Sequence, residues 1–418
     1  MPAIHIRKIV SMRRIFLCVC LCAMRVEASA PDVYGYGTRA MGMAGLNASE
    51  ARGHDAVYHN PAGLLLGTTP SCAVGFSYGG QSLELNHSLI DAPKTSQTHI
   101  GGAIPLPLGG FMANRLALGF GFVVPTETVL HAYLPTPGTP HFSLVGYRTQ
   151  TVTIQAAMAV RLTEDITAGA GLIALSTLEG AIDVAPNAEG RIGSSARDQL
   201  VAEYAPIIGL SWTPNRYWSF AAVHRGESQA RFGLPLDANL GDNFPVPIPI
   251  LRVHGTAQYD PRHSEFEVSA YQGDLRWAIN LAWHEWSRFP QPVSDATRPA
   301  DLPALPTPNF EDRWAVGFAL ETSWDSIDFG GTVRGGYRYR PTPVPDTQTV
   351  HAFLDSNRHV FALGHSLTWQ MFTWRLAAQY HHMEERKTIS VDQLTDAITP
   401  LHHHGSLWML STEIGVDL

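Results

Sequence analysis

The chain has 418 residues, of which 45% are hydrophobic and 16% are charged, and it contains 37 glycines and 29 prolines. This composition argues against a coiled coil and against a disordered chain. The formal net charge of -8 at pH 7 is spread along the sequence, so we expect no nucleic-acid partner. Length alone is compatible with two or three ordinary domains or with one large β-barrel.

The start of the chain has the order of a secretory signal peptide. Basic residues precede the apolar run of residues 15–24, and small residues follow it at positions 28–30. The apolar run is too short to span a bilayer as a helix. We therefore predict a signal peptide over residues 1–30, cut at one of the last three positions. Only Cys72 would remain after cleavage, which excludes an intramolecular disulfide and a multi-cysteine metal site.

The motif HNPAGLLLG lies between this segment and the first alternating run of residues. Asn60 suits the N-cap of a helix, Pro61 its first position, and Ala62 follows inside it. The motif therefore predicts the start of a short helix.

From Cys72 onward, apolar and polar residues alternate in runs of about ten residues. In the last run, Trp408, Leu410 and Ile414 form an apolar face, while Glu413 lies on the polar face. No later segment offers the roughly 18 consecutive apolar residues of a transmembrane helix. Because only a closed barrel satisfies every backbone group of such strands in hydrocarbon, the pattern predicts an all-β fold, a transmembrane antiparallel β-barrel.

The runs predict fourteen strands, joined alternately by short turns and long loops, as is typical of such barrels. Residues 260–274, with the stretch FEVSAY, are either part of a broken strand or an insertion, so the count could change by about two. The predicted strands start near Cys72, Thr98, Arg115, Gly146, Ile166, Val201, Trp218, Leu251, Leu275, Asp312, Ile327, Arg358, Phe372 and Gly405.

Three separated parts of the chain carry a family resemblance. They are residues 34–64 with the Asn-Pro-Ala step, the stretch WAINLAWHEWSRF at 277–289, and the motifs RGGYRYRPTPVPD and DSNRHVFALGHSLTW within 334–369. On these motifs the chain resembles the FadL/TodX outer-membrane transporters of long-chain fatty acids and other hydrophobic compounds. The resemblance implies a 14-stranded barrel over residues 71–418 in the outer membrane of a Gram-negative bacterium. It also implies an N-terminal plug of short helices, residues 31–70, inside the lumen.

The resemblance further implies passive transport. Long-chain fatty acids are the first expected substrate and aromatic hydrocarbons the alternative. The ligand would bind in the lumen and leave sideways through the wall, at an inward kink of the third strand. The expected partners are these hydrophobic small molecules, outer-membrane lipid and the barrel-assembly machinery, with no cofactor.

Two arginines are the candidate ligand-binding residues. Arg334 and Arg338 lie on the polar face of one predicted strand, where a guanidinium could bind a fatty-acid carboxylate bidentately. The alternative is a structural role, because barrel lumens commonly hold networks of arginines and acids.

Two glycines mark the candidate lateral opening. Gly119 and Gly121 leave the inner face of the third strand without side chains, and glycine in a strand often marks a bulge or bend. Prolines at 105, 107 and 125 cannot donate ladder hydrogen bonds, so we expect an interrupted ladder here. Alternatively, these glycines only make room for the plug.

Two other functions compete with transport of hydrophobic compounds. A barrel enzyme would need a nucleophile, and the string GFSYG offers Ser77, but it lies inside a predicted strand and no turn to a helix follows. A general porin would have a water-filled lumen without a plug.

The tryptophans are explained by aromatic belts at the two membrane interfaces. Five histidines, at 381, 382 and 402–404, are interpreted as part of a solvated loop, so we expect neither a metal site nor catalytic residues.

Overall fold

The structure is a computed structural model that describes residues 30–92, 94–126, 130–131, 140–142, 144–145, 150–186, 192–238, 251–290, 293–295, 307–326, 329–348, 352–391 and 398–418. The predicted signal peptide lies outside the described residues, except for Ala30. No helix among the described residues is long and apolar enough to cross a membrane.

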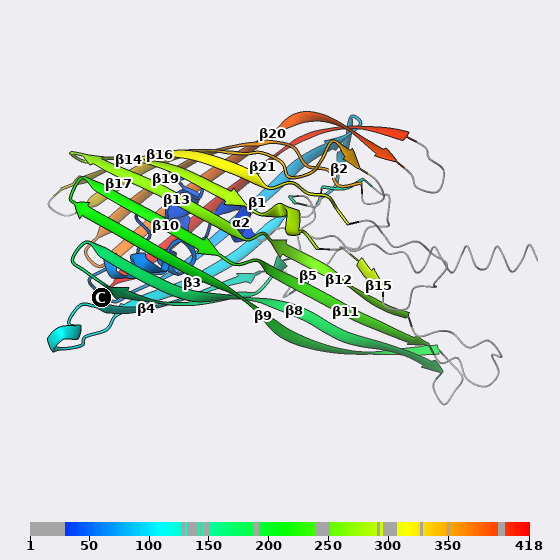
Figure 1. Cartoon of the computed structure of the whole chain (residues 1–418), viewed down its shortest axis with the longest axis horizontal. Coiled ribbons are helices and arrows are strands. Elements are labelled where there is room, and N and C mark those ends of the chain that lie inside the picture. Colours follow the sequence, from blue (N-terminus) through cyan, green and yellow to red (C-terminus); the bar gives the residue numbers. More distant parts are fainter. Residues whose placement is uncertain are drawn as a thin grey trace, which may run out of the picture.

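The described strands form a closed antiparallel barrel (Figure 1). Each wall strand pairs with the next along the chain, and β1 pairs with both β3 and β21, which closes the wall. The wall consists of β1 (Ser71–Leu85), β3 (Thr95–Pro105), β4 (Leu116–Pro125), β7 (Thr153–Arg161), β8 (Ile166–Pro186), β9 (Ile192–Asn215), β10 (Trp218–Arg225) continued by β11 (Ser228–Ala238), β12 (Leu251–Asp260) continued by β13 (His263–Gln272), β14 (Leu275–His284), β16 (Arg313–Asp325), β17 (Gly330–Arg340), β19 (Arg358–Trp369), β20 (Phe372–Val391) and β21 (Ile398–Asp417).

These segments make fourteen wall strands, as predicted. The ambiguous segment at residues 260–274 is part of a broken strand, because β10 pairs with β13 and β11 pairs with β12. The break falls at Pro261 and Arg262, and FEVSAY lies within β13. The predicted start at Gly146 lies outside the described residues, and β7 begins at Thr153.

One end of the barrel carries the short turns and the C-terminus, and the other carries the long loops (Figure 1). We call them the short-turn end and the long-loop end. At the short-turn end, Gly273 adopts a left-handed conformation with φ of 61°, which a residue without a side chain adopts without strain. The loops hold the short elements β2 (Ser88–Ile90), β5 (Leu130–His131), β6 (Gln150–Thr151), β15 (Val293–Asp295), β18 (Thr347–Gln348), η2 (Gly110–Met112) and η3 (Trp286–Arg288).

The two faces of the wall differ in polarity as the alternation predicts. Apolar side chains are exposed on the outer face, where Leu363 is 69% and Ile414 is 53% exposed. Their neighbours on the inner face, such as Gln379 and Glu413, are polar and buried. An apolar band of this kind on a closed barrel faces lipid.

The segment that precedes β1 lies inside the barrel (Figure 1, blue). Its elements are α2 (Ala30–Tyr34), α3 (Thr38–Met41), α4 (Asp55–His59) and the 3-10 helix η1 (Pro61–Leu66). Most of its residues are buried, and we call residues 30–70 the plug.

Candidate functional site in the barrel lumen

Asn60 holds the last turn of the plug against the wall. Its Oδ1 accepts a hydrogen bond from Ala62 N at 3.1 Å, which caps η1 as the sequence predicts. Its Nδ2 donates to the carbonyl oxygen of Ala48 and to Ser211 Oγ, both at 2.8 Å. Opposite it, a Cβ on Gly209 would lie 2.0 Å from Asn60 Oδ1, so only glycine fits there. The motif therefore links two plug segments and strand β9.

Replacing Asn60 by Ala should loosen the plug. Loss of the cap alone costs about 0.5–2 kcal/mol. Leaving the Ala48 carbonyl buried without its donor adds about 1–3 kcal/mol. Thermal melting in detergent micelles, together with hydrogen exchange of the plug amides, measures both effects. Asn215→Ala is the matched control, because Asn215 Oδ1 also accepts from a backbone N–H two residues on, but at an exposed turn. Equal melting and exchange for the two variants would contradict the role given to Asn60.

The plug contacts the wall over small residues of β3, β4 and β7. Val57 and Leu64 belong to a buried apolar cluster with four wall alanines, at positions 103, 117, 157 and 159. A Cβ on Gly119 would lie 2.5 Å from Leu64 Cδ2 and 2.7 Å from Val57 Cγ2, and one on Gly121 would lie 2.4 Å from Tyr36 Oη. Both glycines therefore make room for the plug.

The hydrogen-bond ladders around these glycines are continuous. β4 pairs with β3 and with β7 without a shift of register. The interrupted ladder that we expected at this strand is thus absent from the described residues, because Pro105 and Pro125 stand at the ends of their strands. The part that Gly119 and Gly121 play in ligand release stays a prediction.

The outer face of the same wall is hollowed. A hollow of about 750 Å³ is lined by exposed apolar side chains, including Ile104, Leu118, Phe120 and Met158, and by Gly119. Since Leu64 of the plug packs on the inner side of Gly119, one layer of backbone separates the plug from the hollow at this point.

A ladder does end between β9 and β10. Their pairing stops at Ile207 and Arg225, and Gly226 N then donates to the carbonyl oxygen of Pro206 at 2.8 Å. Beyond this point β11 pairs in parallel with β8, starting at Phe232.

Arg334 faces the lumen, where it contacts an acid shared with the plug. Its Nε donates to Glu321 Oε2 at 2.9 Å and its Nη1 to Ser366 Oγ at 2.8 Å. Arg39 of α3 donates to the other oxygen of the same carboxylate at 3.0 Å. Glu321 therefore joins a plug arginine to a wall arginine.

Arg338 lies in the lumen on the same strand. Its Nη2 donates to Asn280 Oδ1 at 2.7 Å and contacts Glu265 Oε1 at 3.3 Å. Its Nε is buried and has no hydrogen-bond partner among the described residues. The binding of a ligand by Arg334 and Arg338 stays a prediction.

Sequence reasoning missed the polar contacts that hold the plug. Glu413 accepts hydrogen bonds from Thr38 N at 3.1 Å and Arg375 Nη1 at 2.7 Å, and it contacts His99 Nε2 at 2.9 Å and His54 Nε2 at 3.3 Å. The sequence signal for this role was an acid on the inner face of a strand whose outer face is apolar.

A second acid binds the plug backbone at Ala48 and Ser49. Glu267 accepts hydrogen bonds from Ala48 N at 3.2 Å and from Ser49 N at 3.0 Å.

In α4, burial lowers the pKa of His59 to about 3, so this side chain stays neutral beside the backbone of Tyr36.

An apolar cluster lies at the long-loop end of the plug. Phe289 and Phe310 pack in a tilted arrangement with ring centroids 4.3 Å apart, and Trp286 and Phe353 contact them. Val33 and Tyr34 of α2 belong to the same buried cluster. We call these aromatic residues of the loops the apolar cap.

The other candidate residues have structural positions. Ser77 lies in the middle of β1 and donates to Ser411 Oγ at 2.9 Å, with no turn to a helix after it. The predicted loop at the five histidines is wrong, because all five lie in strands, although His382 is exposed and His402 and His404 are half-buried. His381 and His403 are buried, because β20 and β21 are both 20 residues long and carry the alternation through this segment.

Comparison with known proteins finds a matching sequence family and solved structures with a similar fold. A family sequence model described as "Outer membrane protein transport protein (OMPP1/FadL/TodX)" matches residues 19–403. No curated protein matches the sequence.

Solved structures share the fold at low sequence identity. A FadL homologue from Pseudomonas aeruginosa is 13% identical with a TM-score of 0.65, over 94% of this chain and 99% of that one. The toluene transporter TodX of P. putida is 12% identical with a TM-score of 0.53, over 93% of this chain and 99% of that one. The toluene transporter TbuX of Ralstonia pickettii is 14% identical with a TM-score of 0.51, over 91% and 98%.

Proposed function

Because this chain belongs to the OMPP1/FadL/TodX family of outer-membrane transport proteins, and is a transporter of hydrophobic compounds rather than an enzyme, we propose that its cargo is long-chain fatty acids. The long-loop end then faces the cell exterior and the short-turn end the periplasm. Aromatic hydrocarbons are the second candidate, because a neutral aromatic molecule that enters between the residues of the apolar cap would contact aromatic rings.

The observation that carries the proposal is the Nε–H of Arg338, for which the described part of the chain offers no acceptor. A buried donor without an acceptor is costly, and a carboxylate oxygen satisfies it with a charge-assisted hydrogen bond. Arg334 is less suited, since its Nε and Nη1 already have partners. A fatty acid in the lumen would thus direct its carboxylate to Arg338 and its chain to apolar surface.

The cargo enters through the apolar cap and leaves sideways near β4. Two observations support this route: the aromatic residues of the cap belong to the same buried cluster as Val33 and Tyr34 of α2, and the outer hollow lies behind Gly119. If η1 moved away from β4, the alanines and glycines on the lumenal face of this wall, directly opposite the outer hollow, would become accessible to the cargo.

Replacing Arg338 by Ala should weaken the binding of a fatty acid. Loss of one charge-assisted hydrogen bond costs about 1.5–3 kcal/mol, or roughly tenfold or more in Kd. Binding of a neutral hydrocarbon of similar length should stay unchanged. Tryptophan fluorescence titration with both ligands in detergent micelles measures the difference.

Arg334→Ala is the matched control, because both arginines lie on the inner face of β17 and contact acids. Equal loss of both ligands in Arg338→Ala, or no loss, would contradict the proposed carboxylate contact. In liposomes, uptake of a labelled fatty acid without uptake of a sugar tests transport itself.

A further inference from the structure

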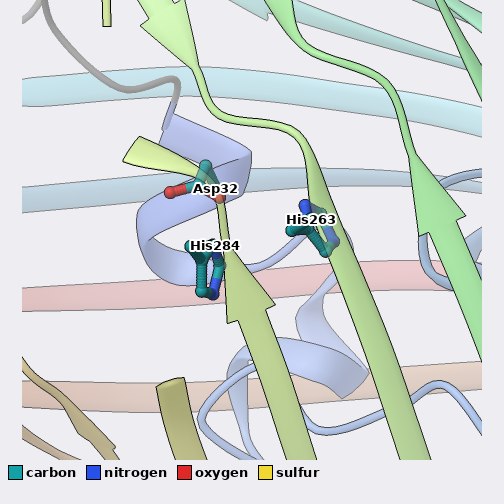
Figure 2. A group of neighbouring side chains, drawn as sticks. All are labelled: Asp32, His263 and His284. Carbon is teal, nitrogen blue, oxygen red and sulfur yellow. The ribbon is translucent and has the colours of Figure 1, made fainter. Parts of the chain in front are cut away.

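A group of two buried histidines and one aspartate lies next to Glu265, which contacts Arg338. His263 Nε2 is 3.9 Å from Glu265 Oε2. Asp32 belongs to α2, His263 begins β13 and His284 ends β14. Figure 2 shows the three side chains gathered between the first plug helix and the two strand ends. One ligand atom of each lies within 4.8 Å of those of the other two.

The barrel brings the two histidines together through strand register. His263 and His284 are direct partners in the β13–β14 ladder, so their side chains lie on the same face of the wall, with ring centroids 5.3 Å apart. They are 5% and 7% exposed. The plug adds the aspartate from a segment more than two hundred residues away in sequence.

The ring nitrogens of His284 are available to bind a metal ion. Neither of its ring nitrogens has a hydrogen-bond partner among the described residues, although the side chain is buried. Such an unpaired buried group is costly and is rare in native proteins. A metal ion bound to one of these nitrogens would remove this cost.

The surroundings of Asp32 suit a metal-ligating carboxylate. Arg340 Nη2 donates to Asp32 Oδ2 at 2.9 Å, and Arg340 Nη1 donates to the backbone oxygen of Asp32 at 2.7 Å. Hydrogen bonds from an outer shell commonly orient such ligands. Arg340 also places a positive charge beside the site, which a bound dication must tolerate, so the carboxylate is required for binding.

We propose that Asp32, His263 and His284 bind one divalent transition-metal ion of the Zn²⁺ class. Two imidazoles and one carboxylate are ligands that this class of ion accepts, with a solvent molecule in the remaining position. Metal–ligand distances of about 2.0–2.2 Å require the three side chains to close slightly around the ion. The ion fixes α2 to the wall beneath the apolar cap.

A second buried group, His54, His99 and Glu413, has comparable spacing. There Glu413 already accepts hydrogen bonds from Thr38 N and Arg375 and contacts both histidines. The carboxylate of Glu413 is thus engaged without an ion. His54 Nε2 forms no hydrogen bond among the described residues but lies 3.1 Å from Asp55 Oδ1 and 3.3 Å from Glu413 Oε2, so this group serves as the internal control for the first one.

The test uses the untagged full chain in detergent micelles after removal of metal by a chelator. Co²⁺ added to this protein should give visible ligand-field bands that saturate at one equivalent, and Zn²⁺ should displace it and raise the melting temperature. His284→Ala and Asp32→Asn should each weaken Co²⁺ binding by at least about tenfold. His99→Ala should leave the bands unchanged, provided that limited proteolysis shows the plug of this variant to be as protected as in the unmodified protein.

Heat-dependent gel migration confirms that each variant is a folded barrel. Bands that persist in His284→Ala, bands that disappear in His99→Ala instead, or no bands in the unmodified protein would each overturn the proposal. None of these outcomes depends on the identity of the cargo, so they are separate from the test of Arg338.

Discussion

In a Leu64→Ala background, we expect Gly119→Val to reduce uptake of a hydrophobic substrate, whereas Leu64→Ala alone should not. The valine occupies the space between the plug and the outer hollow, where a Cβ already lies 2.5 Å from Leu64 Cδ2. Shortening Leu64 removes the closer clash in the closed state, while Val57 Cγ2, 2.7 Å from the new Cβ, has to shift slightly. The valine stays in the proposed exit. Overpacking costs about 1–3 kcal/mol, which as a barrier slows passage by a factor between about five and about one hundred and sixty.

Uptake of a labelled fatty acid into liposomes measures this effect, and thermal melting checks that the variants fold. The matched control is Gly317→Val with Leu46→Ala. A Cβ on Gly317 of β16 would lie 2.8 Å from Leu46 Cδ1, so the same exchange occurs at a plug contact outside the hollow. Equal uptake by the two double variants would contradict an exit at β4. The end of the β9–β10 ladder at Pro206 would then be the next place to test.

Glu413→Gln should release the plug from the wall. The side chain of Glu413 is fully buried and contacts Arg375, His54, His99 and the backbone of Thr38. Removing one partner of a buried ion pair leaves the other charge uncompensated, which costs about 3–5 kcal/mol. We expect a lower melting temperature, faster proteolysis of the plug, and leakage of a small sugar through the barrel in liposomes.

Glu384→Gln is the control for this variant. Glu384 pairs with His359 at 2.8 Å, but both side chains are partly exposed, and pairs of this kind contribute about 0–1 kcal/mol. A Glu413→Gln protein that melts earlier while its plug stays protected and its lumen stays closed to sugar would show that Glu413 stabilises only the wall.

The histidines of β20 and β21 show where a sequence pattern was misjudged. Their density suggested a solvated loop, but His381 and His403 continue the alternation of long strands and are buried. The strands extend beyond the apolar band, where polar residues replace apolar ones on the outer face and hide the period-two signal. Strand ends are therefore less readable than strand centres.

By itself the sequence determined the class of fold, the number of wall strands, the apolar outer face and the capped turn at Asn60. These features are local, because lipid imposes the same alternation on every strand and a cap needs only neighbouring residues. Only the tertiary structure decided the partners of Arg334, Arg338 and Glu413. Thr38 and Glu413, for example, are 375 residues apart. Contacts inside the lumen depend on strand register, on closure of the barrel and on how the plug is seated. No spacing along the chain encodes that combination, because any inward polar residue satisfies the same alternation.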